Sequence, residues 1–262
     1  MKNNIFIKNK SSYNLTYTKP WIGFGYDINQ KKKTLKFILK KANISNKNQK
    51  ILDIGFGIGK MLFLFDKSCE LNGLEISKSA IDYVSKEAKR KNYKNYEFKL
   101  LGGNEEKYPF ESGKFDIIIC SHVLEHVPNR DFLLDEIYRL CAPDGKVIVA
   151  VPINENSSDF ENSDLHFSMY NPILLKDKLK SHGLNVIFEF QNGATYHLSK
   201  FMLNFRKIPF FGFFINGFFE VIFSAMPFCI ENLIDNLMLK LGYPPQQIFL
   251  VASKRMCWYT IQ

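Results

Sequence analysis

The chain has 262 residues, close to the upper size for one hydrophobic core, so one domain with an insertion is the simplest organisation. Its 46% hydrophobic and 23% charged content is typical of a folded protein and excludes a chain kept disordered by composition. The net charge of +9 comes from 30 lysines and only 5 arginines, whereas specific nucleic-acid readers depend on arginine, so no nucleic-acid partner is expected.

The cysteines and the N-terminus indicate the cell compartment. Five cysteines, at positions 69, 120, 141, 229 and 257, show no paired spacing. An odd number without a framework favours a reducing compartment and argues against a zinc site. The first residues contain no apolar run long enough for a signal peptide. We therefore expect a cytoplasmic protein, with association to a membrane as an open alternative.

The expected elements alternate along the chain. Residues 1–45 form an N-terminal arm and a helix, with helical apolar spacing over 31–41. Ser77 is placed to cap the helix that follows it. The expected strands are 50–54, 70–76, 96–101, 115–120 and 146–151. The expected helices are the segment that follows the glycine-rich turn and runs through residue 65, then 78–91 and 131–141. A turn is expected at 143–145. Continuous apolar strands between helices predict an α/β fold with a parallel sheet buried on both faces, whose ligand crevice lies at the carboxyl ends of the strands.

A glycine-rich turn follows the first strand. In Ile51-Leu-Asp-Ile-Gly-Phe-Gly-Ile-Gly-Lys60, the glycines let the backbone bend sharply and approach a ligand. The spacing is Gly-x-Gly-x-Gly, whereas the dinucleotide fingerprint needs its third glycine where Lys60 stands. Asp53, two residues before the first glycine, repels phosphates but suits a ligand with an ammonium and a sulfonium. This charge favours S-adenosylmethionine over a dinucleotide.

The second strand ends in an acidic residue, Glu75. A carboxylate there accepts hydrogen bonds from both ribose hydroxyls, as in enzymes that bind NAD. Glu75 alone therefore indicates a nucleoside cofactor and no more, and a surface acid that caps the next helix is the alternative.

The combination of motifs over roughly residues 50–190 resembles class I methyltransferases of the ubiquinone and menaquinone biosynthesis type. The motifs are the Asp-x-Gly-x-Gly-x-Gly turn, the later Glu75, Gly103-Asn-Glu-Glu-Lys-Tyr-Pro-Phe110, Phe115-Asp-Ile-Ile-Ile-Cys-Ser-His-Val-Leu-Glu-His-Val127 and Ala142-Pro-Asp-Gly145. The resemblance implies a Rossmann-like, seven-stranded, mostly parallel sheet with helices on both faces. Its last strand would be antiparallel, and residues 247–253 fit that strand.

The resemblance also assigns the residues of a cofactor site. Asp53, Gly55, Gly57 and Gly59 would surround the methionine part of S-adenosylmethionine, Glu75 the ribose and Ile76 the adenine face. Asn104 stands where the family usually has Asp and would accept from the adenine amino group through its amide oxygen. Glu105 would offer its backbone N–H to the ring, and Ser121 would line the methionine end.

Two histidines are candidates for a catalytic base on the acceptor side. His122 and His126 are four residues apart, so on a helical turn they would share one face. His126, in Glu125-His126-Val127, matches a residue common in the resembled family and is the first candidate; a structural imidazole is the alternative. His166, in Asp164-Leu-His-Phe167, matches another family position at the pocket rim. His182 precedes Gly183 at the end of a helix and is expected to be structural.

A metal site is not expected. Ubiquinone O-methyltransferases carry an acidic residue and then Glu-His, which together can hold a divalent ion. Here the first position is His122, which leaves Glu125 and His126. Two ligands make a poor site, and a histidine in place of the acid disfavours magnesium.

Before the last strand the chain departs from the family pattern. We expect a methyltransferase domain over 46–195 and 246–256, interrupted by a hydrophobic helical insertion over 196–245. Its second half carries an apolar helix face made of Ile230, Leu233, Ile234, Leu237 and Leu241, opposite Glu231, Asp235 and Lys240. The apolar run 210–226 is short for a membrane span and contains a glutamate. A lid over the acceptor, a membrane contact through 201–241 and a homodimer seam are the three interpretations.

The sequence thus predicts a methyltransferase that uses S-adenosylmethionine to methylate an oxygen or carbon of a small, hydrophobic or lipid-linked acceptor. Two alternatives stay open. One is a methyltransferase of a sugar or cell-envelope precursor, and the other is a membrane-associated module that binds the cofactor without turnover.

Overall fold

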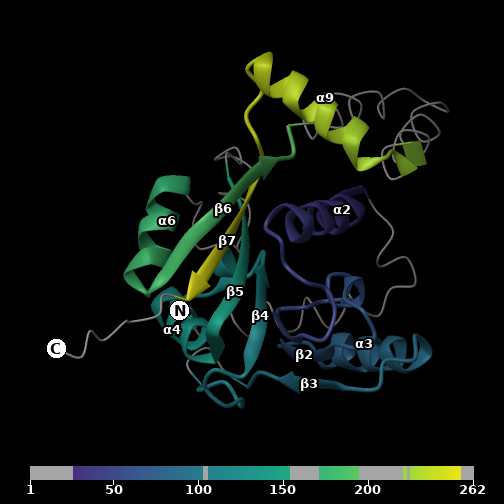
Figure 1. Cartoon of the computed structure of the whole chain (residues 1–262), viewed down its shortest axis with the longest axis vertical. Helices are drawn as coiled ribbons and strands as arrows, with labels where there is room; N and C mark the ends of the chain where they lie inside the picture. The colour runs from purple at the N-terminus through teal and green to yellow at the C-terminus, as the bar shows by residue number, and fades with distance from the viewer. Residues whose placement is uncertain (1–25, 103–105, 154–170, 195–220, 223–224, 255–262) are drawn as a thin grey trace.

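The segments expected to be strands form one sheet in a computed structural model that describes residues 26–102, 106–153, 171–194, 221–222 and 225–254 (Figure 1). Two further strands, which the resemblance required, complete it. The strands are β1 (Lys50–Ile54), β2 (Glu70–Glu75), β3 (Tyr96–Leu100), β4 (Phe115–Ser121), β5 (Cys141–Pro152), β6 (Leu184–Asn192) and β7 (Gln247–Lys254). The helices are α2 (Tyr26–Lys41), α3 (Lys78–Arg90), α4 (Arg130–Leu140), α6 (Pro172–Ser181) and α9 (Phe228–Lys240), with 3-10 turns η1 (Leu62–Leu64) and η2 (Leu124–His126).

The sheet has seven strands in the order β3-β2-β1-β4-β5-β7-β6. β7 runs antiparallel to both of its neighbours, and the pairs among β1 to β5 are parallel. This confirms the Rossmann-like sheet and the antiparallel last strand. The order reverses at β1, which lies between β2 and β4, so the chain leaves the carboxyl end of β1 at a topological switch point.

Helices cover both faces of the sheet, and each face has its own apolar core. On one face, α2 and α3 pack through Leu35, Ile38 and Val84. On the other, α4 and α6 contribute Leu134 and Leu179 among others. Strands whose side chains are buried on both sides account for the continuous apolar runs of β1, β4 and β5.

Helix α3 begins as the sequence predicted, because the Ser77 hydroxyl accepts a hydrogen bond from Ala80 N at 3.3 Å. Two other predictions were wrong. The segment after the glycine turn is not an α-helix; only the 3-10 turn η1 forms, because Gly57 and Gly59 have positive φ and cannot start a helix. The turn expected at 143–145 lies inside β5 instead, where the register against β4 shifts.

The predicted insertion, 196–245, is described at residues 221–222 and from 225 onward, and the rest of it lies outside the described residues. Within it, α9 lies against α2, above the sheet (Figure 1). None of the described helices is both long and apolar enough to cross a bilayer. The division of the chain into arm, domain and insertion stays a prediction.

The end of α6 is held by its last histidine. His182 lies 2.7 Å from Asp135 Oδ1 through Nδ1 and 3.0 Å from Asp131 Oδ1 through Nε2, so it ties α6 to α4 as a structural residue. Gly183 then turns the chain into β6 with a φ of +78°, and a Cβ there would meet the Tyr138 ring at 2.7 Å.

We expect Gly183→Ala to destabilise the fold more than Gly113→Ala. Both glycines have a positive φ, which costs a residue with a Cβ roughly 1–2 kcal/mol. Only at position 183 would the new methyl group also meet an aromatic ring, since nothing lies within 4 Å at position 113. Urea unfolding of the two variants measures the difference, and equal losses would contradict the tight packing against Tyr138.

Candidate functional site

The carboxyl end of β1 places an acidic residue and a glycine turn at the switch point of the sheet. Asp53 pairs with Gly73 of β2 on one side and Ile119 of β4 on the other. The turn begins at Gly55, whose N–H continues the ladder by donating to Leu74 O at 2.7 Å. In sheets of this topology the crevice outside such strand ends is where ligands bind.

All three glycines of the turn adopt left-handed backbone conformations. Gly55, Gly57 and Gly59 have φ values of +70°, +52° and +68°. At Gly55 a Cβ would also overlap the Val123 side chain, which comes from the loop after β4. Glycine is therefore needed at these positions both for the conformation and for the close approach.

Phe56, between the first two glycines, folds back over the sheet. It is buried, and its ring lies 5.2 Å from that of Phe98 on β3. A Cβ on Gly73 would overlap the Phe56 ring, so the glycine inside β2 makes room for the turn. The sequence analysis missed Gly73, although a glycine inside an apolar strand is a signal for such a close approach.

The Glu75 carboxylate is bonded to the glycine turn. Its Oε2 accepts from Gly57 N at 2.9 Å, and its Oε1 accepts from Ile76 N at 2.8 Å and Ser77 N at 3.1 Å. Burial raises the pKa of Glu75, and the three backbone hydrogen bonds only partly oppose it. Glu75 thus fixes the turn against the end of β2 and brings the two predicted parts of the cofactor site together.

Asp53 is buried without comparable compensation. Its side chain is 3% exposed, and within the described part of the chain no hydrogen bond reaches its carboxylate. Burial first, and then repulsion from Glu75, raise the pKa of Asp53 well above its usual value. A buried carboxylate with no positive partner fits a ligand that brings a cation and excludes one that brings a phosphate.

The remaining predicted cofactor residues lie at the same edge or outside the described residues. Ile76 is half-buried directly after Glu75, and Ser121 ends β4 beyond the Ile54–Cys120 pair. Asn104 and Glu105 lie outside the described residues. Their assignment to the adenine stays a prediction.

His122 follows β4 with a left-handed backbone, φ +54°, and precedes the 3-10 turn η2. The prediction that His122 and His126 share one face of a helical turn was therefore wrong, because only residues 124–126 are helical. The cause is the pairing of His122 N with Ala150 O at 2.8 Å, which extends the β4–β5 ladder past the end of β4.

Glu125 is completely buried next to His122. Its Oε1 lies 3.3 Å from His122 Nδ1, but neither carboxylate oxygen has a hydrogen-bond donor in good alignment among the described residues. Burial opposes ionisation, yet His122 and His126 nearby lower the pKa of Glu125. The pair is therefore a buried carboxylate facing an imidazole.

Two glutamines continue this contact on the other side of His122. His122 Nε2 lies 3.3 Å from Gln247 Oε1, at the start of β7, and Gln247 Nε2 donates to Gln30 Oε1 of α2 at 3.3 Å. Both glutamines are buried. The sequence analysis missed them; a glutamine opening an apolar strand, and another at the helical spacing of Thr34 and Ile38, are the signals that could have found them.

His126 ends η2 and is half-buried, with its N–H donating to Val123 O at 2.9 Å. It lies close enough to Glu125 to influence the charge there. His166 lies outside the described residues. The catalytic roles of both histidines stay predictions.

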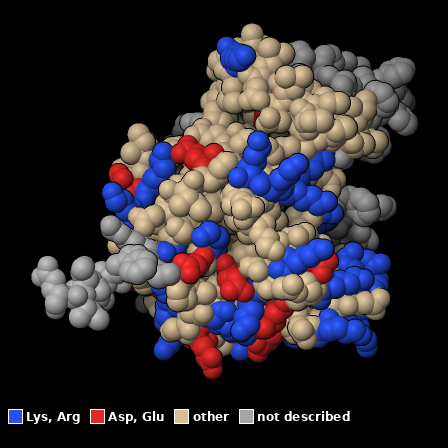
Figure 2. Space-filling view, viewed as in Figure 1, with Lys and Arg blue, Asp and Glu red and all other residues tan. Residues whose placement is uncertain are grey.

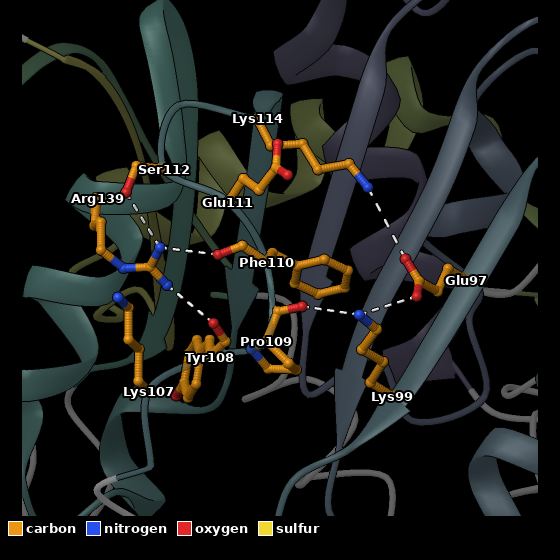
Figure 3. A pocket seen from close by; sticks show the side chains of 10 residues that line it. All are labelled: Glu97, Lys99, Lys107, Tyr108, Pro109, Phe110, Glu111, Ser112, Lys114 and Arg139. Atoms are coloured by element: carbon orange, nitrogen blue, oxygen red, sulfur yellow. Dashed lines mark hydrogen bonds and ion pairs between the residues drawn. The ribbon is translucent and has the colours of Figure 1, made fainter.

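A cavity of about 740 Å³ lies elsewhere, beside the amino end of β4 (Figure 3). Its lysines and arginine are mostly neutralised: Lys99 pairs with Glu97 at 2.9 Å, and Arg139 pairs with Glu136 at 2.6 Å. Arg139 also donates to the carbonyls of Tyr108 and Phe110, so it holds the loop in place (Figure 3). Ligands of such sheets bind at the carboxyl ends, so we place the site at the glycine turn and not here.

Comparison with known proteins identifies the family of the domain that carries this turn. Residues 52–149 match the family described as "Methyltransferase domain". A sterol 4-C-methyltransferase of Caenorhabditis elegans is 30% identical over 134 residues, 51% of this chain and 40% of its own length. A demethylmenaquinone methyltransferase of Lactococcus lactis is 29% identical over 136 residues, 50% of this chain and 53% of its own. The chain thus spans about half the length of these curated relatives or less.

Among solved structures, a phosphoethanolamine N-methyltransferase of Haemonchus contortus, in complex with S-adenosyl-L-methionine, superposes with a TM-score of 0.58. The identity is 19%, and the match covers 84% of this chain and 52% of that one. At this identity the likeness shows the fold alone. The segment matched by the family, 52–149, contains the glycine turn, Glu125 and the two histidines of the loop after β4.

We expect Asp53→Asn to stabilise the free protein at neutral pH. A carboxyl with a raised pKa binds its proton more tightly in the folded than in the unfolded chain, so stability falls as the pH rises from 3.8 toward the folded pKa. The amide removes this loss, worth about 1.4 kcal/mol for every pH unit by which the pKa is raised. Below that range the two proteins should be equally stable.

Urea unfolding between acid and neutral pH measures this effect, with the exposed Asp144→Asn as the matched control. Only Asp53→Asn should flatten the pH dependence. If wild type and Asp53→Asn keep the same slope, Asp53 is not the strained carboxylate inferred from its burial.

Proposed function

Residues 52–149 form a class I methyltransferase domain that resembles the ubiquinone and menaquinone biosynthesis enzymes, and from this premise we propose that the chain transfers a methyl group from S-adenosylmethionine to a small hydrophobic or lipid-linked acceptor. The observation that carries the proposal is the buried, uncompensated carboxylate of Asp53 beside three left-handed glycines. It favours a ligand that brings a positive charge over a dinucleotide, whose pyrophosphate is negative.

In this proposal, residues at this edge of the sheet would contact the parts of the cofactor. Asp53 would hold the ammonium group, and the glycine turn would make room for the amino-acid part. Glu75 would give up hydrogen bonds from backbone N–H groups and accept hydrogen bonds from the ribose hydroxyls instead. Ile76 and Ser121 would lie against the adenine and the methionine end. When bound, S-adenosylmethionine supplies a methyl group made electrophilic by a positive sulfur. The protein's own task is to orient the acceptor and to remove its proton.

His122 is the residue we propose as the base on the acceptor side. Its side chain is 22% exposed, at the same edge of the sheet as Asp53, and is held between Glu125 and Gln247. An imidazole in this place can take a proton from an acceptor hydroxyl or acidic carbon, and the Glu125 carboxylate stabilises the resulting cation. His126 and His166, the candidates suggested by the resemblance, have the secondary role of contacting the acceptor in this proposal.

The hydrophobic character of the acceptor is supported by two relatives whose names state sterol and demethylmenaquinone substrates. Membrane contact through 201–241 and a homodimer seam are finer parts of the same proposal. A hydrophobic acceptor would be reached most directly by a protein that stays close to a bilayer.

Calorimetry with S-adenosylmethionine and with its demethylated product tests the cofactor. Wild type should bind both, and Gly55→Ala should bind neither, because the added methyl group overlaps Val123 and the φ is left-handed. Gly242→Ala is the matched control, since it has a positive φ with nothing within 4 Å. Absence of binding to wild type would end the proposal.

Turnover is tested with labelled cofactor and two acceptors, demethylmenaquinone and a glycosyl-lipid precursor. Label in the first supports a hydrophobic quinone-like acceptor, and label only in the second would redirect the proposal to cell-envelope precursors. Binding without label in either, or in a total lipid extract, would identify a cofactor-binding module and overturn the enzymatic part.

We expect His122→Asn to bind the cofactor normally but to transfer methyl groups about 10²- to 10⁴-fold more slowly, the usual contribution of a general base. Asparagine is chosen because it tolerates the left-handed φ of +54°. His182→Gln, a histidine held by Asp131 and Asp135 far from the turn, is the control and should keep full activity. Unchanged turnover in His122→Asn would remove His122 as the base.

A further inference from the structure

Helix α9 is oriented with its acids inward and its leucines outward. Glu231 and Asp235 are 1% and 2% exposed, whereas Leu233 and Leu237 are 69% and 55% exposed. An amphipathic helix on a protein surface normally buries its leucines and exposes its acids. Among the three interpretations of the insertion, a lid or core helix that buries this apolar face does not describe α9.

The inward acids explain why the helix keeps this orientation. Glu231 Oε2 lies 3.2 Å from Lys33 Nζ of α2, and Asp235 Oδ2 accepts from Gly193 N, just past β6, at 2.8 Å. Rotating α9 to bury its leucines would break both of these buried contacts. Breaking a buried ion pair is costly because one charge is left unpaired.

The outward face of α9 is a continuous apolar strip. Ile230, Leu233, Leu237 and Leu241 recur at spacings of three and four residues, so they lie on one side of the helix. Three neighbours along the chain extend it: Val221, Ile222 and Tyr243 are also exposed. A contiguous apolar surface of this kind marks a contact with a partner or a membrane.

Lysines gather on α2 beside this strip. Lys32, Lys36 and Lys40 recur every four residues on α2, which packs against α9; Lys36 and Lys40 are exposed and Lys32 is half-buried. Figure 2 shows blue Lys and Arg atoms beneath the tan lobe at the top of the molecule. Burial and the nearby charges of Lys36 and Lys91 lower the pKa of Lys32. Lysines that repel one another in the free protein are stabilised by an anionic surface.

We infer that the apolar strip of α9 and the lysine stripe of α2 together form a surface that docks on a bilayer containing anionic lipids. The leucines would enter the boundary between headgroups and acyl chains, and the lysines would lie at the headgroups. A protein partner fits less well, because protein interfaces are depleted in lysine, and Lys32, Lys36 and Lys40 supply the charge that α2 brings to this surface. The inference deepens the membrane contact that forms part of the proposed function, by naming the residues and the lipid charge, and it does not depend on methyl transfer.

Co-sedimentation of the full chain with vesicles tests the apolar strip. We expect binding to vesicles of phosphatidylcholine and phosphatidylglycerol in equal parts, and at least a roughly tenfold lower partition coefficient for the double variant Leu233→Asp with Leu237→Asp. The matched control is Ile173→Asp with Leu174→Asp on α6, two side chains 65% and 67% exposed on a different helix. The control should bind like wild type.

The lysine stripe is tested with Lys32→Gln and Lys36→Gln combined. This variant should lose affinity for the anionic vesicles and show a weaker dependence on salt, whereas vesicles of phosphatidylcholine alone should not distinguish it from wild type. Lys94→Gln with Lys107→Gln, two exposed lysines away from α2, is the control. Equal loss in the control pair would mean that only net charge matters and would overturn the assignment to this stripe.

Three outcomes would overturn the inference: no binding of wild type to either vesicle, unchanged binding of the α9 variant, or conversion of a dimer to a monomer by that variant without any vesicle binding. Circular dichroism and calorimetry with the demethylated cofactor show whether each variant is folded. Because those readouts do not require a membrane, failure of the cofactor site and failure of the docking surface remain distinguishable.

Discussion

Two buried carboxylates, only one of which accepts hydrogen bonds from described residues, determine the chemistry at the switch point of the sheet. Glu75 receives three backbone hydrogen bonds from the glycine turn and the start of α3, which partly offset the cost of burying its charge. Asp53 is as deeply buried, receives no such bond among the described residues and is repelled by Glu75. One acid therefore shapes the turn, and the other leaves a negative site that a cationic ligand would complete. Stability of the free protein and affinity for that ligand oppose each other here.

On the other side of β4, buried polar groups connect the loop after that strand with the helices above the sheet. One chain of contacts runs from Glu125 through His122 and Gln247 to Gln30. Three further contacts hold α2 and α9: Asn192 Nδ2 donates to Thr34 Oγ1, Asp235 accepts from Gly193 N, and Lys33 pairs with Glu231. Buried polar groups of this kind fix the elements that carry them, since each lost contact leaves an unpaired group. The position of α2 and α9 is thus coupled to the orientation of the proposed base.

The sequence predicted five of the strands and the glycine turn because these depend on local information, whereas β7 was assigned through the resemblance and β6 was not located. Continuous apolar runs identify strands buried on both faces, and the left-handed glycines follow from the motif itself. It failed where a feature depends on distant contacts. The spacing of His122 and His126 suggested a helical turn, but the ladder contact of His122 N with Ala150 O decides that backbone. Gln30 and Gln247 were missed because their partners lie 217 residues apart in the chain.

Helix α9 shows this limit most clearly. Periodicity divides a helix into an apolar and a polar face, but it does not say which face turns inward. That choice depends on what the neighbouring surface offers. Here α2 and the end of β6 offer the two acids a lysine and a backbone N–H, while Phe228 at the start of α9 packs against Phe37 and Phe190. Two acids can then be buried with partners while the leucines stay outside. The polar contacts that hold the covering helices over the domain are therefore also the reason why the apolar face of α9 is available to a membrane.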